Sequence, residues 1–581
     1  MLTNLTIRNF KRFREVSIEL GPSVVLIGPN NSGKTSALQA VALWDVGLRL
    51  WNAKRGGKAS PEKRPGVTIN RRDLVPIPIP TANLLWRDLH VREGNLAEPD
   101  PAARSRTKNI RIDIEVSGIS DGLPWTCGLE FDFSNDESFV CRPLRLPEYQ
   151  HVQVKLAKFS QIPDVAANTK VAYLPPMSGL SDREFIKQSG EVGFLIGQGQ
   201  TAQVLRNLCY QLVSNPDSVP FWHEITRRIQ ALFGVTLQSP TLVQERSEIV
   251  MEYQERGTTL DLACSGRGLQ QTLLLLAYLY ANPNTVLLLD EPDAHLEILR
   301  QRQTYQLITE VAQSQKSQII AASHSEVLLN EAADRDVVVS FVGRPHRIDD
   351  RGHQTAKALK EIGFENYYQA EQRGWILYLE GSTDLAILRA FAECLKHPAA
   401  EHLQAPFVHF VCNQPREVSK HFFGIREAKP DLVGIAIFDR LDRPMPTDLG
   451  AVGTMWTRRE LENYLCLPHV LLTFAGSEEP SGLFAEPRKR LMEELIGDRV
   501  PPIALRNPAD SWWINMKATD DFLDPLFAEY YQRLELPNLM RKTNYHELAR
   551  FVSVSDIHPE IIEKLDQIVA VAKRARPLTE S

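Results

Sequence analysis

The sequence predicts an α/β protein with two sheet-containing parts, followed by a mostly helical C-terminal region. A glycine-rich loop, Gly28–Thr35, stands between the apolar run Val24–Ile27 and a helical stretch that begins at Ser36. Four later apolar runs of strand length are each followed within two residues by an acidic or histidine side chain: Val286–Leu289, Gln318–Ala322, Trp375–Leu379 and Val433–Phe438. Ligands of open parallel sheets bind at the carboxyl ends of the strands, so these side chains are the first candidates for functional residues.

The loop Gly28–Thr35 matches G-x-x-x-x-G-K-[ST], the P-loop pattern. Its glycines allow a tight turn whose N–H groups can point at a phosphate, and the helix N-terminus adds partial positive charge. We expect Lys34 to lie between the β- and γ-phosphates and the Thr35 hydroxyl to bind Mg²⁺. The residues predicted to contact the nucleotide here are Asn30, Asn31, Ser32, Gly33, Lys34, Thr35 and Ser36.

A carboxylate pair follows the apolar run that ends at Leu289. Asp290 is predicted to hold Mg²⁺ through water, and Glu291 to polarise the water that attacks the γ-phosphate. His324, at the end of the next apolar run, is a candidate for reaching the same phosphate. Alone, an Asp-Glu pair could be a helix N-cap and a single histidine is usually structural. Downstream of a P-loop, the catalytic interpretation is favoured.

The pair Ser265-Gly266 opens an apolar helix that runs through Tyr280. Such a pair at a helix start can bind phosphate, although by itself it is better explained as a plain N-cap.

Together, the P-loop, this Ser-Gly helix, Asp290–Leu296 and Ser323–Ser325 resemble the ATP-binding-cassette-type heads of structural-maintenance-of-chromosomes, RecF and OLD-like ATPases. The resemblance implies that two heads enclose two ATP molecules, so that Ser265 and Gly266 contact the ATP of a partner subunit, and that His324 is the switch histidine. It therefore implies a homodimer or a higher homo-oligomer formed through the heads. Arg267 departs from the usual second glycine of the signature.

We expect this ATPase domain to cover residues 1–345, with a helical insertion at about 195–234. Periodicity fades between Trp51 and Asn109, where an insertion or long loop is predicted. Residues 346–371 are expected to connect this domain to a second α/β domain at 372–470, and residues 471–581 to form the helical region.

The second domain repeats the pattern of buried strands that end in carboxylates. Glu380 follows the first strand with Asp384 one helical turn later, and Asp439 follows the second with Asp442 just beyond. Glu460 and Glu462 form a third acidic group. Carboxylates gathered at neighbouring strand ends suit hard divalent cations, and two such ions can stabilise both oxygens of a phosphodiester undergoing cleavage. The alternative is that each acid only caps the following helix.

This spacing resembles a TOPRIM domain, and the two domains together resemble the OLD-family (overcoming lysogenization defect) nucleases. The resemblance implies metal binding by Glu380, Asp384 and Asp439, with Glu460 and Glu462 in the later acidic role and Lys542 as the lysine of the site. Asp442 departs from the Asp-x-Asp pattern of that family, because Asp439-Arg440-Leu441-Asp442 has one more residue between its acids.

The chemistry predicted from these features is ATP binding and hydrolysis with Mg²⁺, and nucleic-acid cleavage dependent on Mg²⁺ or Mn²⁺. The resemblance adds a role as a bacterial anti-phage effector. DNA is favoured over RNA as substrate. An accessory defence subunit is a further possible partner. Two alternatives remain: a RecF- or SMC-like DNA-binding repair ATPase whose TOPRIM fold does not cut, and a sensor ATPase that controls a separate toxin subunit.

Composition limits the remaining choices. The net charge of −6 means that nucleic acid must be bound by local basic patches rather than by a global field. The seven cysteines form no C-x-x-C pair, which favours reduced thiols over a disulfide framework or a zinc site. No stretch has the layout of a signal peptide or the length of a membrane span. We therefore expect a cytoplasmic protein without a membrane partner.

Overall fold

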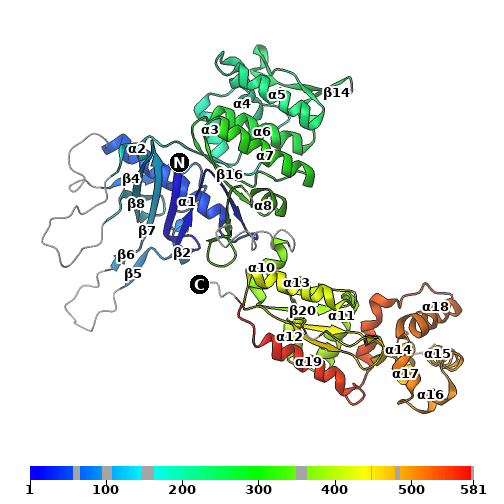
Figure 1. The fold of residues 1–581 in the computed structure, drawn as a ribbon. Coiled ribbons are helices and arrows are strands. Elements are labelled where there is room, and N and C mark those ends of the chain that lie inside the picture. The colour runs from blue at the N-terminus through cyan, green and yellow to red at the C-terminus, as the bar shows by residue number, and fades with distance from the viewer. Residues whose placement is uncertain are drawn as a thin grey trace, which may run out of the picture. The chain divides into compact units, whose positions relative to one another are not determined.

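The computed structural model describes residues 1–55, 66–94, 107–145, 162–333, 335–348, 363–446, 448–477 and 485–577. The chain forms two compact units, Met1–Ala356 and Lys357–Glu580. Both combine sheets with helices, as predicted for an α/β protein (Figure 1). Residues 349–362, which make up much of the predicted connector, lie outside the described residues.

The first sheet of the N-terminal unit is antiparallel. Its strands, in spatial order, are β2 (Phe13–Glu19), β1 (Leu2–Phe10), β7 (Arg111–Ser120), β8 (Leu123–Asn135), β9 (Ser138–Pro143) and β4 (Val67–Asn70). The edge strand β4 lies within the stretch predicted as an insertion or long loop, so the long-loop alternative is wrong there and the insertion alternative stays a prediction. Its buried Val67 and Ile69 alternate with exposed residues, which is the pattern of a half-buried strand too short to stand out in sequence.

The second sheet carries the P-loop. Its spatial order is β10 (Val171–Leu174), β16 (Val286–Asp290), β17 (Gln318–Ser323), β3 (Ser23–Ile27), β18 (Val337–Ser340) and β19 (His346–Arg347). All pairings are parallel except that of β19. Every residue of β16 and β17 is buried, as expected for parallel strands covered on both faces.

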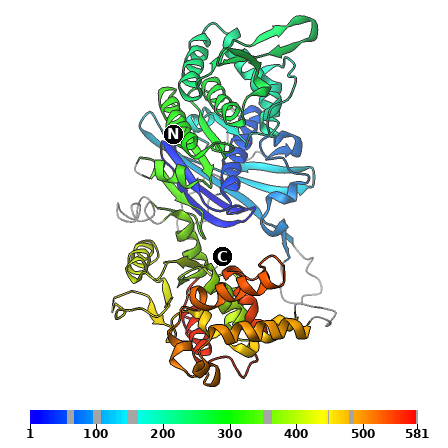
Figure 2. The ribbon, with the colours of Figure 1, turned by 90° about the vertical axis from the view of Figure 1, so that its right-hand side faces the viewer.

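Helix α1 (Lys34–Arg55) contacts strands of both sheets, and its apolar side chains share one hydrophobic core with them (Figures 1 and 2). The other α-helices among the described residues of this unit are α2 (Asp164–Ala167), α3 (Ser189–Gly197), α4 (Leu205–Ser214), α5 (Val219–Phe233), α6 (Arg267–Ala281), α7 (Ile298–Ser314) and α8 (Glu326–Ala332). Helices α4, α5 and α6 pack on one another, and α7 packs on α6. The short strands of this unit are β5 (Arg92–Gly94), β6 (Thr107–Asn109), β11 (Thr236–Leu237), β12 (Thr241–Val243), β13 (Glu248–Val250), β14 (Glu252–Glu255) and β15 (Thr258–Asp261).

The C-terminal unit contains a parallel sheet in the order β21 (Val408–Phe410), β20 (Trp375–Leu379), β22 (Val433–Phe438) and β23 (Val452–Met455). Where the structure describes this unit, its α-helices are α10 (Phe364–Arg373), α11 (Ser382–Cys394), α12 (Ala399–Leu403), α13 (Pro415–Ala428), α14 (Pro468–Ser477), α15 (Ala485–Arg499), α16 (Pro502–Arg506), α17 (Ser511–Asn515), α18 (Asp524–Arg533) and α19 (Pro559–Ala572). The described residues of this unit also form two 3-10 helices, η9 (Leu461–Tyr464) and η11 (Lys542–Phe551), and one π-helix, η10 (Ala518–Leu523).

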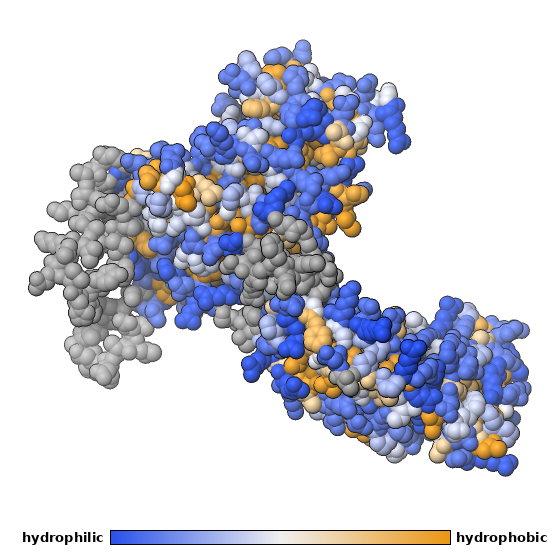
Figure 3. All heavy atoms as spheres, viewed as in Figure 1, coloured by the Kyte–Doolittle hydropathy of each residue, from blue (hydrophilic) through white to orange (hydrophobic). Residues whose placement is uncertain are grey.

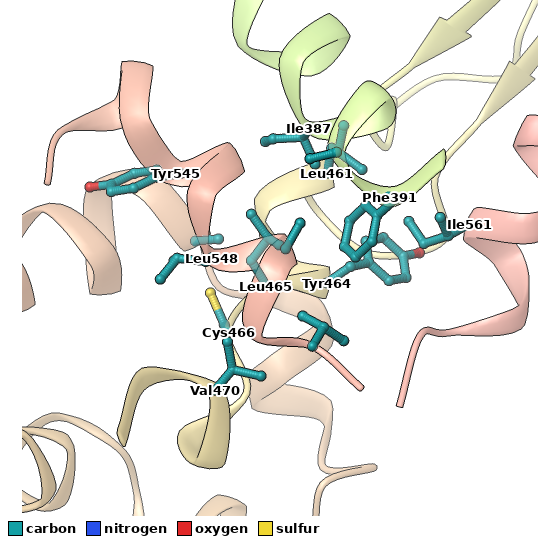
Figure 4. Packing of buried hydrophobic residues seen from close by; sticks show 14 of the residues in the cluster. Ile387, Phe391, Leu461, Tyr464, Leu465, Cys466, Val470, Tyr545, Leu548 and Ile561 are labelled. Atoms are coloured by element: carbon teal, nitrogen blue, oxygen red, sulfur yellow. The ribbon is translucent and has the colours of Figure 1, made fainter. Parts of the chain in front are cut away.

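One hydrophobic core joins the sheet of this unit to the helices that follow it. In Figure 4, Leu461, Leu465 and Val470 lie among side chains from α11, η11 and α19. Helix α11 packs directly on η11, although the two are far apart in the sequence. This packing fixes the positions of residues 460–465 and of the start of η11, which matters for the candidate site below.

On the face drawn in Figure 3, hydrophobic residues form scattered patches among hydrophilic ones. Within the described ranges, no helix combines the length and the apolar character needed to cross a membrane.

Candidate functional site

The P-loop joins β3 to α1, as its sequence predicts. The ammonium group of Lys34, the first residue of α1, donates hydrogen bonds of 2.7 Å to the carbonyl oxygens of both Gly28 and Pro29. Gly33 has a φ of +104°, and a Cβ atom there would lie 2.7 Å from Cδ of Arg12 and 2.9 Å from a ring atom of Phe13. Both the left-handed backbone and the close packing therefore require glycine at this position.

The polar groups of this loop fit a polyphosphate. Ser32 is buried, and its hydroxyl oxygen has no hydrogen-bond partner. The hydrogen bonds of the Lys34 ammonium group go to carbonyl oxygens, which carry no net charge. Burial lowers the pKa of Lys34, although the nearby carboxylates of Glu291 and Asp290 act in the opposite direction. A phosphate would provide both residues with anionic acceptors. Asn30, Asn31 and Thr35 are exposed around them, and Ser36 is half-buried.

Asp290 lies at the end of β16, next to the P-loop helix. Its Oδ1 accepts a hydrogen bond of 3.1 Å from the Thr35 hydroxyl, and its Oδ2 accepts one of 3.1 Å from the Tyr173 hydroxyl. Burial raises the pKa of Asp290 to about 6. A carboxylate and a hydroxyl side by side are oxygen ligands of the kind that Mg²⁺ prefers, so Thr35 and Asp290 fit the predicted magnesium site.

The next residues of the predicted catalytic set also lie together. Glu291 has a φ of +49°, and its backbone N–H donates to the carbonyl of Ala322 in β17. Its Oε1 is 3.8 Å from Nδ1 of His324, and both side chains are partly exposed. Asp293, which was not among the predicted site residues, is buried and hydrogen-bonds Ser323, directly before His324.

Ser265 and Gly266 stand at the N-terminus of α6. The Ser265 hydroxyl donates 2.7 Å to the carbonyl of Leu262, and Gly266 is exposed with open space at the position of its missing Cβ. The contact of this pair with a partner subunit stays a prediction.

Two family models match parts of this unit. Residues 1–44 match a model described as "AAA ATPase domain", and residues 213–330 match one described as "AAA domain, putative AbiEii toxin, Type IV TA system". The first range contains the P-loop and the second contains Ser265, Asp290, Glu291 and His324. The chain therefore carries an ATPase domain of the AAA type, whose members bind ATP, usually with Mg²⁺.

Among solved structures, the chain is similar to the SMC head domain from Thermotoga maritima, with 14% identity and a TM-score of 0.33, over 60% of this chain and 98% of that one. It is also similar to an Smc head domain with an extended coiled coil, bound to the C-terminal domain of ScpA derived from Pyrococcus furiosus. The values there are 12% identity and a TM-score of 0.33, over 62% of this chain and 99% of that one. With TM-scores of this size, the assignment rests on the family models and the site geometry. No curated protein matches the chain.

A second group of functional candidates lies in the C-terminal unit. Strands β20 and β22 are parallel neighbours, so Glu380 and Asp439, which follow them directly, come to the same edge of the sheet. Asp384, in the first turn of α11, accepts hydrogen bonds from the backbone N–H groups of Glu380 (3.0 Å) and Gly381 (3.3 Å). Burial, with the charge of Glu380 adding to it, raises the pKa of Asp384 to about 6.

Asp439 and Glu462 complete this group, which we call the acidic cluster (Glu380, Asp384, Asp439 and Glu462). Burial and a hydrogen bond with Glu380 raise the pKa of Asp439, whose Oδ1 also accepts from the backbone N–H of Leu461 at 3.2 Å. Burial, with Asp384 adding to it, raises the pKa of Glu462 to about 7. One oxygen of Glu462 is buried without a hydrogen-bond partner.

Lys542 faces the acidic cluster. Its Nζ atom lies 3.8 Å from Oε1 of Glu462. Burial alone would lower the pKa of Lys542, but the charges of Glu462 and Glu380 outweigh it and the pKa is raised.

Two of the predicted acidic residues lie elsewhere. Asp442 forms an ion pair of 2.9 Å with Arg459, and its side chain is 81% exposed. The structure does not bring it to the acidic cluster. Glu460 accepts a hydrogen bond of 3.1 Å from the backbone N–H of Thr519, so it anchors η10. It still lies near enough to add to the negative potential at Glu462 and Lys542.

The acidic cluster is not a formed coordination shell. In the described part of the chain, no three histidine, cysteine or acidic side chains are spaced to hold one ion as they stand. Glu380 and Asp439 lie close enough to hydrogen-bond each other, and burial together with that bond raises the pKa of Asp439. The donor set itself, carboxylate oxygens with one left unpaired, fits a hard divalent cation.

Asn413 also contacts the acidic cluster, although no motif in the sequence indicated it. Its side-chain oxygen accepts the backbone N–H of Asp439 at 3.1 Å, and the neighbouring Cys412 N–H donates to the carbonyl of Glu380 at 3.3 Å. Asn413 and Cys412 both have positive φ values, 59° and 44°. A bend of this kind after β21 has no simple sequence pattern, because any short loop containing asparagine could adopt it.

Proposed function

We propose that this chain is a metal-dependent nuclease under the control of its ATPase domain, and that it acts in defence against phage. The ATPase part follows from the family models and the P-loop geometry. The nuclease part is supported by one main observation: four carboxylates from separate elements converge with Lys542 at the carboxyl edge of a parallel sheet.

The order of that sheet supports a TOPRIM interpretation. Glu380 and Asp439 lie at the ends of its two central strands, β20 and β22, and the edge strands β21 and β23 flank these two strands. Placing so many acids together is costly for folding unless a cation or a proton neutralises them. The raised pKa values of Asp384 and Glu462 express this cost. If these acids served only to stabilise the fold, nothing would offset the free energy that their clustering costs.

Each residue of the cluster has a task in phosphodiester cleavage. Glu380, Asp384 and Asp439 would hold divalent cations, which when bound supply positive charge at the attacking and leaving oxygens. Lys542 can pair with a phosphate oxygen once Glu462 contacts a bound cation instead of the lysine. Arg443, four residues after Asp439, and Arg541, next to Lys542, are exposed and suited to backbone phosphates. DNA is the favoured substrate, and a structured RNA has the same backbone chemistry.

If Ser265 and Gly266 contact the nucleotide of a partner subunit, a nucleotide site that is complete on both sides would require two heads. We infer a homodimer on this ground. The family description that names a toxin of a toxin–antitoxin system agrees with a defence role, and a separate accessory subunit is compatible with both.

A second candidate is a DNA-binding or sensor ATPase whose TOPRIM-like unit does not cut. The position of Asp442 favours it, because the residue is paired with Arg459 instead of facing the cluster.

The deciding experiment is cleavage by the purified full chain. Plasmid, linear DNA and total tRNA are each incubated with Mg²⁺ or Mn²⁺, with and without ATP, while ATP turnover is followed in the same tubes. Glu380→Gln removes one charge from the cluster, and Asp442→Asn is its matched control outside the cluster. Cleavage that survives Asp442→Asn but not Glu380→Gln establishes the nuclease. ATP turnover without cleavage of any substrate supports the second candidate.

A further inference from the structure

The two carboxylate oxygens of Asp290 are held by different residues. Thr35, the residue after the P-loop lysine, donates to Oδ1, and Tyr173 donates to Oδ2, each at 3.1 Å. Thr35 belongs to the predicted magnesium site, whereas nothing in the P-loop pattern includes Tyr173.

Tyr173 is well placed to control the orientation of this carboxylate. It lies in β10, which pairs in parallel with β16, the strand that ends at Asp290. Its own backbone carbonyl accepts a hydrogen bond of 3.1 Å from the Tyr278 hydroxyl in α6. Its hydroxyl is the donor in the bond to Asp290, because a carboxylate oxygen can only accept.

We propose that Tyr173 is a positioning residue for magnesium: its hydroxyl holds one oxygen of Asp290, so that the carboxylate stays turned toward Thr35 when the nucleotide binds with its metal. Residues that hydrogen-bond a metal ligand from outside the coordination shell fix its orientation, and their loss typically lowers metal affinity about 10- to 100-fold. The inference concerns the ATPase domain and does not depend on the proposed nuclease.

A purely structural role for Tyr173 makes a different prediction. If the hydroxyl only satisfied a buried carboxylate, its removal would lower the stability of the unit without a specific effect on Mg²⁺. Nucleotide binding in the presence and absence of the metal therefore separates the two roles.

The test compares Tyr173→Phe with Tyr305→Phe in the full chain. Tyr305 is a matched control, because its buried hydroxyl also donates to an aspartate, Asp336, at 2.8 Å, but neither residue belongs to the nucleotide site. Binding of a fluorescent ATP analogue is measured in EDTA, and the Mg²⁺ concentration for half-maximal tightening is then determined by titration. Melting temperatures verify that each variant is folded.

For Tyr173→Phe we expect nucleotide affinity in EDTA within about twofold of the parent and an Mg²⁺ midpoint raised roughly tenfold or more. Tyr305→Phe should leave both unchanged. An Mg²⁺ midpoint that stays at the parent value, or a loss of the same size in EDTA, would overturn the proposal. Replacing Tyr173 by 4-aminophenylalanine, which keeps a donor at the same place, should restore the midpoint; failure of this rescue counts equally against it.

Finally, the effect must pass through Asp290. In an Asp290→Asn background, Tyr173→Phe should change the Mg²⁺ midpoint by less than about twofold, because the carboxylate that it positions is gone. A full tenfold change in that background would show that Tyr173 acts by another route.

Discussion

Lys542 and Glu462 face each other at 3.8 Å, although one begins η11 and the other lies in η9. Glu462 is almost fully buried, and its oxygen nearest the lysine has no hydrogen-bond partner. The lysine is therefore the main counter-charge in reach of a group of acids that repel one another.

Lys542→Met should abolish cleavage while leaving ATP turnover intact, since it removes the cation that faces the acidic cluster. Loss of a single preorganised electrostatic group commonly lowers a rate by about 10²–10³. Cleavage rate and ATPase rate are measured on the same preparation. Lys517→Met, which removes an exposed lysine paired with Asp520, is the control and should cut like the parent. Equal rates for Lys542→Met and the parent would remove Lys542 from the site.

Lys34→Ala should abolish ATP binding, because its ammonium group is held at the mouth of the P-loop by two carbonyl oxygens. A nucleotide titration by calorimetry should find affinity reduced at least about 100-fold, as expected for loss of a charged hydrogen bond to phosphate. Lys54→Ala, at the far end of the same helix, is the control. An unchanged affinity for Lys34→Ala would place the nucleotide elsewhere.

Divalent metal should stabilise the C-terminal unit, because a bound cation relieves the repulsion within the acidic cluster. At a concentration 100 times its dissociation constant, a ligand stabilises the folded state by about 2.7 kcal/mol. The melting temperature should therefore rise with Mn²⁺ and fall back with EDTA. This response should disappear in Glu380→Gln and persist in Asp442→Asn. A Glu380→Gln variant that is still stabilised by Mn²⁺ would locate the metal away from the cluster.

Asp45, in the middle of α1, predicts a pH dependence of stability. Burial raises its pKa from 3.8 to about 6, although Arg49 pairs with it at 2.8 Å. An acid with a raised pKa binds its proton more tightly in the folded state, so its protonated form favours folding. That contribution is complete below pH 3.8 and is lost as pH rises to about 6, a change of roughly 3 kcal/mol.

In the parent protein, the melting temperature should therefore fall as pH rises from 4 to 6.5. Asp45→Asn should make this fall smaller and should raise the stability at neutral pH. The exposed Asp217→Asn serves as the control and should keep the slope of the parent. If Asp45→Asn keeps that slope as well, the titrating group lies elsewhere.

The features that the sequence predicted well are those that depend on residues contiguous in the chain. The P-loop lies between β3 and α1 because the glycine pattern and the apolar run beside it are local. Parallel strands then bring their ends to one edge, so Asp290 comes to Thr35, and Glu380 comes to Asp439. Knowing that a residue follows a strand was enough to place it.

The residues that escaped prediction act through tertiary contacts. Tyr173 reaches Asp290 from a neighbouring strand, and in sequence it looks like any aromatic core residue. Asp442 was grouped with Asp439 by spacing, but the chain turns after Asp439 and sends Asp442 to Arg459. The orientations of the Tyr173 and Asp442 side chains cannot be predicted from residue types, because they depend on which residues pack opposite them in the folded chain.

Asn413 offers the sharpest test of how the acidic cluster is held. Its backbone is left-handed, with a φ of 59°, and its side chain accepts the N–H of Asp439. Asn413→Ala loses the hydrogen bond and also pays about 1 kcal/mol for a left-handed conformation, whereas Asn413→Gly loses the bond but adopts that conformation freely. The melting temperature should therefore be lower for the alanine variant than for the glycine variant. Cleavage should fall to a similar extent in both, because both leave the start of the Asp439 segment unanchored. If cleavage instead followed stability, with the glycine variant active and the alanine variant not, the bend itself and not the hydrogen bond would be what positions Asp439.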